Sequence, residues 1–276
     1  MALTYRRIQS ASRTGTAGTP RCGDDPISNA IRPCRLTGAP KIIEKVQHRL
    51  TEVAIRAARP RMPSFYTAAE LKTDLAIHSI GTLAGVAAVI VLLDIAIRNH
   101  GSPHFAAIVV YSVGLLAMLG FSAAYNLARP SHWKEALRRC DHGAIFLMIA
   151  GTYTPFVVSI ADPRWRWGLM SIIWLIALTG LVIKLAFPGR LERGSVLVYL
   201  SLGWIGLMAL QPLFASLAAS TISLLAAGGV LYTIGVAFHL WEGLRFHNAI
   251  WHALVVIAAG FHYCAVLFGI ALATAG

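Results

Sequence analysis

The chain has 276 residues, of which 57% are hydrophobic and 13% charged, and its net charge at pH 7 is +12. The mean hydropathy of +0.64 excludes an ordinary soluble globular domain and is typical of a protein that crosses a membrane several times. In a soluble chain such a charge would indicate a nucleic-acid partner, but no nucleic-acid motif accompanies it here. We therefore expect membrane lipids as partners, no nucleic acid, and basic residues that set the topology and contact anionic headgroups.

Residues 1–61 form a basic N-terminal extension. Residues 1–40 are rich in Ser, Thr, Gly, Pro and Arg, a composition that predicts disorder. Segment 41–58 is predicted to be an amphipathic helix on the inner leaflet, because its apolar residues share one helical face: Ile42, Ile43, Val46, Leu50, Val53 and Ala57. An alternative is that translation starts at Met62 and that residues 1–61 are not native. Residues 1–20 lack the apolar region of a signal peptide, so the first span is expected to direct insertion.

Seven apolar segments follow within 62–276. Each has the roughly 20 residues that a helix needs to cross ~30 Å of hydrocarbon, at 75–97, 105–127, 143–161, 167–186, 196–217, 222–240 and 250–272. Within lipid a lone segment satisfies its backbone polar groups only as a helix. The sequence therefore predicts an all-α integral membrane protein with a seven-helix bundle. Pro155 and Pro212 are expected to kink the third and fifth spans.

The basic residues are unevenly divided between the two ends of these spans. Of the 24 lysines and arginines, 21 lie before the first span, after the second, fourth and sixth spans, or, for Lys184, in the last turn of the fourth. Only Arg98, Arg164 and Arg166 lie at the opposite side. Because short cytoplasmic loops collect positive charge, the N-terminus is predicted to be cytoplasmic and the C-terminus outside.

Polar residues inside the spans gather at the predicted cytoplasmic level. Such residues are costly in a membrane and indicate function by default. Alone, each is typical of a helix end, and Asp141 in particular can be interpreted as a helix N-cap. Together they predict one shared polar pocket. They are Glu70, Asp74 and His78 on the first span, Ser122, Tyr125 and Asn126 on the second, Asp141 and His142 on the third, His239 on the sixth, and His247, Asn248 and His252 on the seventh.

Four sequence segments carry a family resemblance. They are ELKTDLAIHSIG at 70–81, SAAYN at 122–126, DHGAIFLMIAGTYTP at 141–155, and HNAIWH at 247–252 followed by His262 and Tyr263. In this order they resemble the hemolysin III proteins, the bacterial branch of the progestin and adipoQ receptor (adiponectin receptor) family. The run from Asp141 to Pro155 is the most specific of them.

The resemblance implies a seven-helix protein of the bacterial inner membrane with a buried zinc near the cytoplasmic face. In the family a histidine of the second span and both histidines of a His-x-x-x-His pair on the seventh hold the metal, and an aspartate of the third span binds its water. Here the aspartate corresponds to Asp141, and His252 is the retained ligand. Three imidazoles and a water make an open, catalytic type of zinc site.

This chain departs from that pattern at two ligand positions, which are Asn126 and Asn248. Amide oxygen is a weak donor for zinc, so the pocket is predicted to be zinc-poor. His78, His142, His239 and His247 lie near the right level to replace a ligand. His247, the candidate surrogate ligand, is displaced by one residue from the family's position, which rotates its side chain by ~100° around the helix.

Three functions remain open from the sequence. The first is a role in membrane lipid sensing or homeostasis, or cytolysis as the family name implies. The second is a zinc-dependent membrane hydrolase acting on a lipid amide or ester, with Asp141 as general base or water-orienting residue, Ser122 as a second catalytic residue and His252 as metal ligand. The third is a structural membrane protein in which the pocket only fixes helix packing. The sequence does not indicate an oligomeric state.

Overall fold

The computed structural model describes residues 67–98, 104–129, 131–187 and 194–273. They belong to one compact unit, Phe65–Gly276. The predicted disorder of 1–40, the amphipathic helix of 41–58 and the alternative start at Met62 lie outside the described residues.

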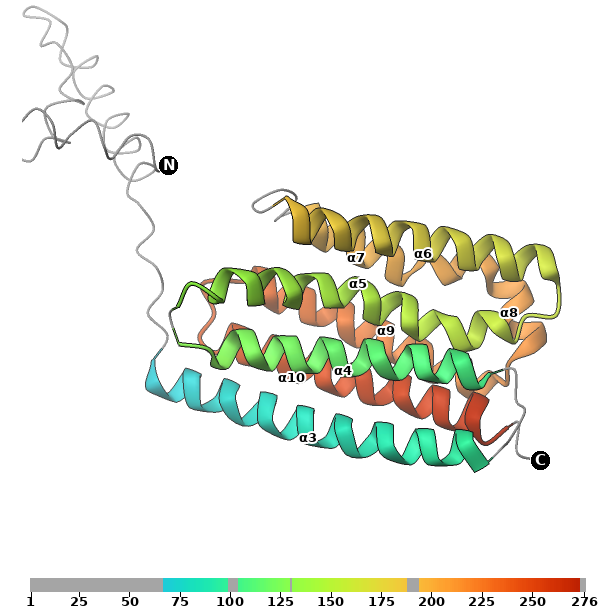
Figure 1. Ribbon diagram of the computed structural model, residues 1–276, viewed down its shortest axis with the longest axis horizontal. Helices are drawn as coiled ribbons and strands as arrows, with labels where there is room; N and C mark the ends of the chain where they lie inside the picture. Colours follow the sequence, from blue (N-terminus) through green and yellow to red (C-terminus); the bar gives the residue numbers. More distant parts are fainter. Residues whose placement is uncertain (1–66, 99–103, 130, 188–193, 274–276) are drawn as a thin grey trace, which may run out of the picture. The chain divides into compact units, whose positions relative to one another are not determined.

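All regular structure in the described residues is helical (Figure 1). The elements are α3 (Ala68–Arg98), α4 (Phe105–Leu127), α5 (Lys134–Val158), α6 (Pro163–Ala186), α7 (Gly194–Gly203), η1 (Ile205–Ala209), α8 (Leu210–Ser216), α9 (Ala219–Leu240), α10 (His247–Val266) and η2 (Leu267–Ala271). Among these residues six helical segments are long and apolar enough to cross a membrane, namely α3, α4, α6, Gly194–Ser216, α9 and His247–Ala271. The prediction of an all-α integral membrane protein is confirmed.

The remaining long helix, α5, is more polar than these six. Its first turns contain Lys134, Glu135, Arg138 and Arg139, and its second half contains Gly, Thr, Tyr and Pro. Yet the bundle encloses it: Ala150, Phe156 and Val157 are at most 1% exposed. A helix with this composition can lie at membrane depth only where other helices cover it.

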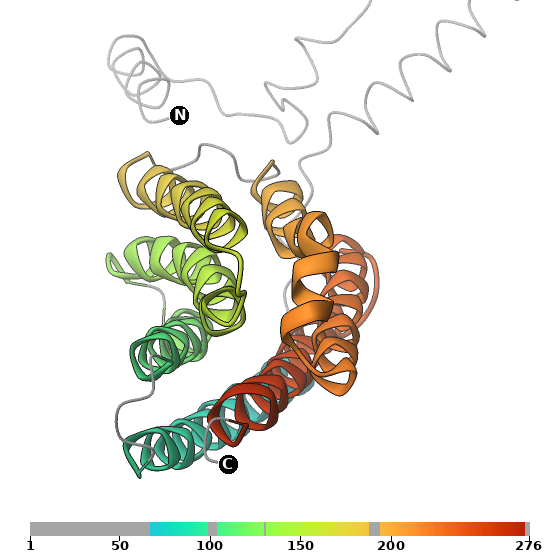
Figure 2. The ribbon, with the colours of Figure 1, turned by 90° about the vertical axis from the view of Figure 1, so that its right-hand side faces the viewer.

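Helices that follow each other in the chain also lie side by side. The pairs α3–α4, α4–α5, α5–α6 and α9–α10 are in contact, and α10 also packs on α3. Figure 2 shows the helices around a shared interior, with α7 and α8 on the side opposite α4. One end of this bundle, where α3, α5 and α10 begin and α4 ends, holds most of the predicted site residues; we call it the polar end.

The contact between α4 and α5 depends on two glycines. A β-carbon at Gly114 would lie 3.0 Å from the carbonyl oxygen of Leu147, and one at Gly151 would lie 3.2 Å from that of Val110. The two backbones therefore touch directly, as small residues allow between membrane helices.

The fifth apolar segment is not one continuous helix. It is divided into α7, the 3₁₀ turn η1 and α8. Pro212 lacks the N–H that would bond the carbonyl four residues earlier, at Met208. The interruption therefore begins in the turns before the proline rather than at it. α5, in contrast, continues through Pro155.

A cavity of about 210 Å³ lies between α5, the interrupted fifth segment and α9. We call it the central cavity. Most of its wall is apolar, and it includes Met148, Ile149, Phe156, Leu213, Leu225 and Ala226.

Candidate functional site

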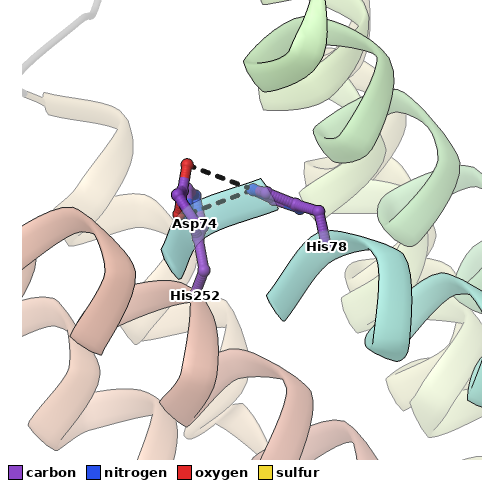
Figure 3. A group of neighbouring side chains, drawn as sticks. All are labelled: Asp74, His78 and His252. Atoms are coloured by element: carbon purple, nitrogen blue, oxygen red, sulfur yellow. Dashed lines mark hydrogen bonds and ion pairs between the residues drawn. The ribbon is translucent and has the colours of Figure 1, made fainter. Parts of the chain in front are cut away.

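Three predicted site residues meet where α3 packs on α10. Asp74 and His78 are one turn apart and so lie on the same face of α3. His252, in the second turn of α10, faces them (Figure 3). Its Nδ1 lies 2.6 Å from Asp74 Oδ1 and 3.1 Å from His78 Nε2, while His78 Nε2 is 3.6 Å from Asp74 Oδ2. We call this group the Asp–His–His cluster.

The Asp–His–His cluster is shielded from the surroundings. His78 is 5% and His252 is 8% exposed, and the side chain of Asp74 is 13% exposed. A carboxylate at this depth requires a cation or hydrogen-bond donors close by. Among the described residues, these three form the group of His, Cys, Asp and Glu with ligand atoms within 4.8 Å of one another. It can therefore share protons or hold a metal ion.

Asp141 lies on α5 next to this cluster. The Ser122 side chain of α4 and the His252 side chain of α10 both lie close enough to its carboxylate to interact with it. α5 begins at Lys134, two turns before Asp141, so the interpretation of Asp141 as a helix N-cap is wrong. Its side chain belongs to the interior of the polar end, where α3, α4, α5 and α10 each contribute a polar group.

The two asparagines at the family's ligand positions have separate hydrogen bonds. The Asn126 side-chain amide donates to the backbone carbonyl of Ser122 on its own helix, at 2.9 Å. The Asn248 amide donates to Asp74 Oδ2 over a long 3.5 Å. Asn126 is thus turned back onto α4, whereas Asn248 supports the Asp–His–His cluster.

Glu70 and Tyr125 stand apart from the cluster. Glu70 accepts hydrogen bonds from the backbone N–H and hydroxyl of Thr67, both at 2.7 Å, and from the backbone N–H of Phe246 at 3.0 Å. Phe246 has a φ of 62°, a left-handed conformation that is costly for a phenylalanine. Glu70 therefore joins the start of α3 to the start of α10. The Tyr125 ring lies 5.3 Å from the Lys134 ammonium.

The other histidines of the polar end do not join the Asp–His–His cluster. The backbone carbonyl of His142 accepts a 2.8 Å hydrogen bond from the Tyr199 hydroxyl of α7. His239 packs against Trp251, with ring centroids 5.3 Å apart. His247 is buried at the first position of α10. Tyr199, which sequence reasoning missed, connects α7 to α5 at the polar end; no spacing signal in the sequence singles it out.

The residues at the family's zinc positions do not fit that metal. Asn126 directs its amide to its own helix, and Asn248 to Asp74. One imidazole and two neutral amides are a poor donor set for zinc. The two α3 residues, by contrast, place a carboxylate and an imidazole beside His252.

Comparisons with known proteins point to one family. A family model described as haemolysin-III related matches residues 72–263. Hemolysin-3 of Bacillus cereus is 36% identical over 191 residues, 69% of this chain and 87% of its own length. The hemolysin-3 homolog of Bacillus subtilis is 36% identical over 192 residues, 69% of this chain and 90% of its own.

A more distant relative extends the likeness to animals. The human monocyte to macrophage differentiation factor is 26% identical over 167 residues, 57% of this chain and 67% of its own length. No solved structure matches the chain. The resemblance seen in the sequence is confirmed: this multi-pass membrane protein belongs to the hemolysin III family.

Proposed function

We propose that the chain is a seven-span protein of the bacterial inner membrane with its N-terminus in the cytoplasm, and that α5 is the additional span. α5 has 25 residues, about 37 Å at 1.5 Å per residue, which is enough to cross the hydrocarbon. Its polar side chains bond within the bundle: Thr152 and Thr154 donate to the carbonyls of Met148 and Ala150, both at 2.8 Å. Labelling of single cysteines from each side of the membrane measures this topology.

The function that the geometry supports best is binding of a single-chain membrane amphiphile, as part of lipid sensing or homeostasis. The observation that carries it is the central cavity beside the polar end. At about 210 Å³ it exceeds the ~150 Å³ apolar cavity that accommodates benzene in a soluble protein. Its apolar wall suits an acyl chain and excludes a charged group.

Tyr199 gives this cavity a polar boundary. It lines the cavity and its hydroxyl donates to the carbonyl of His142, the residue after Asp141. A ligand with its chain in the cavity would thus have its polar group directed to Asp141 and Ser122. An amphiphile fits this division between apolar and polar walls better than a wholly polar or wholly apolar molecule.

The test uses a diazirine-bearing fatty acid incorporated into vesicles with the purified chain. Labelling is expected on peptides of α5 and α9. Ala226 lines the cavity, so Ala226→Phe should fill it and reduce labelling at least severalfold. Val230→Phe on the same helix is the control. Val230 does not line the cavity, and it is 47% exposed. Equal labelling of Ala226→Phe and the unchanged chain would contradict ligand binding in this cavity.

Hydrolysis of the bound lipid's ester or amide bond is the second candidate. It is favoured by the position of Asp141, whose carboxylate is close to the side chains of Ser122 and His252. In this role Asp141 would orient a water toward the carbonyl carbon, with Ser122 holding the carboxylate in place. Mass spectrometry of the same vesicles reads out free fatty acid, which Asp141→Asn should abolish while leaving photolabelling intact.

A further inference from the structure

We propose that the Asp–His–His cluster is a site for a divalent transition-metal ion, zinc foremost, located between α3 and α10. In this site Asp74 and His78 of the first span, together with His252, hold the metal. The family resemblance implies two other positions, which are Asn126 and Asn248 in this chain. The proposal does not depend on ligand binding in the central cavity, because the cluster is not part of that cavity's wall.

The spacing of the three donors agrees with a metal site. Zinc bonds of 2.0–2.1 Å in a tetrahedral arrangement separate neighbouring ligand atoms by about 3.3 Å. The two imidazole nitrogens are 3.1 Å apart, and the nearest aspartate oxygens lie 2.6 Å and 3.6 Å from them. A shift of a few tenths of an ångström would accommodate the ion without a change of helix packing.

Charge favours a cation at the same place. The cluster contains one carboxylate and two imidazoles. Each imidazole directs one ring nitrogen toward the other two side chains. With both imidazoles neutral, the buried group carries a net negative charge, which is expensive in a membrane interior. A divalent ion bound by the deprotonated nitrogens and the carboxylate removes that cost and satisfies all three donors together.

The two substitutions that remove the family's ligands are consistent with a displaced site. Asn126 bonds to its own helix and leaves the α4 side without a metal donor. Asn248 instead approaches Asp74 Oδ2, the place of a supporting residue that orients a metal-bound carboxylate. Two imidazoles and one carboxylate are a donor set of open zinc sites, and also of ferrous sites.

The experiment measures the metal content of the full chain in nanodiscs after zinc loading and dialysis. About one zinc per chain is expected. Asp74→Asn, His78→Gln and His252→Gln should each weaken zinc binding by more than ~100-fold, the upper range for loss of a supporting residue alone. His239→Gln is the matched control, a histidine of the same end that lies outside the cluster. It should retain the zinc.

Two further measurements separate ligand loss from misfolding. Restoring the family's positions with Asn126→His and Asn248→His in the His78→Gln chain should recover zinc binding. Absorption spectroscopy at the zinc edge of the unchanged chain should show a shell of nitrogen and oxygen with no sulfur. Less than about a tenth of a zinc per chain, or unaltered binding by His78→Gln, would overturn the proposal. Ala226→Phe should leave zinc content unchanged, so metal binding and lipid binding can fail separately.

Discussion

The two sides of α5 are held in different ways. Toward α4, the helix is in backbone contact through Gly114 and Gly151, with no side chain between. Toward the interrupted fifth segment, it is held by tyrosine hydroxyls. Tyr153 donates to the carbonyl of Gly203 and accepts from the N–H of Gly206, and Tyr199 reaches back to the carbonyl of His142.

This difference indicates which wall of the central cavity is fixed. Close backbone packing tolerates no rearrangement, because any shift of a few tenths of an ångström produces overlap. A hydroxyl that bridges a break in a helix can be released and remade at the cost of two hydrogen bonds. The side of α4 is therefore expected to be rigid, and the side of η1 to be the wall that yields when a ligand enters.

Adding a side chain between α4 and α5 should have the largest effect. Gly114→Val would place its β-carbon 3.0 Å from a backbone oxygen and 3.2 Å from the Met148 Cα. Because neither atom belongs to a flexible side chain, we expect a loss of about 3 kcal/mol. Thermal unfolding of the purified chain in one detergent measures it. Gly120→Val on the same helix is the control, since a β-carbon there meets nothing within 4 Å. If both variants lose equal stability, the backbone contact is not what holds α4 to α5.

Removing the bridge across the fifth segment should have a smaller effect. Tyr153→Phe leaves the Gly203 carbonyl and the Gly206 N–H without their partner. Backbone polar groups left without a partner away from water cost ~1–3 kcal/mol. Amide hydrogen exchange over 203–209 should become faster while exchange in α4 stays unchanged. Tyr263→Phe, which removes one hydrogen bond to Ala88 on α3, should leave exchange at 203–209 unaltered. Faster exchange in both variants would mean that the bundle loosens as a whole.

The sequence was sufficient for the helices because lipid leaves few alternatives. Apolar length alone located α4 and α9, and the start of α10 was found within three residues of the predicted span. A kink from Pro212 was predicted in the fifth span, but the 3₁₀ turn before the proline was not, since it also depends on Tyr153, which lies far away in the chain. The predicted third span, 143–161, overlaps α5, but α5 begins nine residues earlier, at Lys134, in a polar segment that hydropathy does not include.

The sequence indicated which polar residues lie at the same end of the bundle better than it indicated which of them contact each other. The i, i+4 spacing of Asp74 and His78 placed both on one face of α3, and His252 was expected at the same depth. Which of these residues would meet depends on the rotation of α3 against α10, and spacing along one helix contains no information on that. Glu70 shows the limit: the same spacing grouped it with the pocket, yet it binds the backbone of Phe246 instead.

The ion pair at the exposed start of α5 should contribute least to the stability of the fold, and it should do so only above acidic pH. Hydrogen bonds from Arg138 lower the pKa of Glu135, helped by the charges of Arg138 and Arg139. A carboxyl with a lowered folded-state pKa stabilises the fold above its unfolded pKa of about 4.3, and that contribution is lost as the pH falls through the folded value. Because the Glu135 side chain is 45% exposed, solvent screens the pair and Glu135→Gln should cost at most ~0.5 kcal/mol at pH 7. The difference between variant and unchanged chain, measured by unfolding at pH 7 and in a series of acidic buffers, should decrease steadily as the pH falls below about 4. A difference that persists in acid would mean that Glu135 acts by packing and not by charge. The first turn of α5 would then be held by close contact, as the α4 side is at its glycines, and not by an ion pair in water.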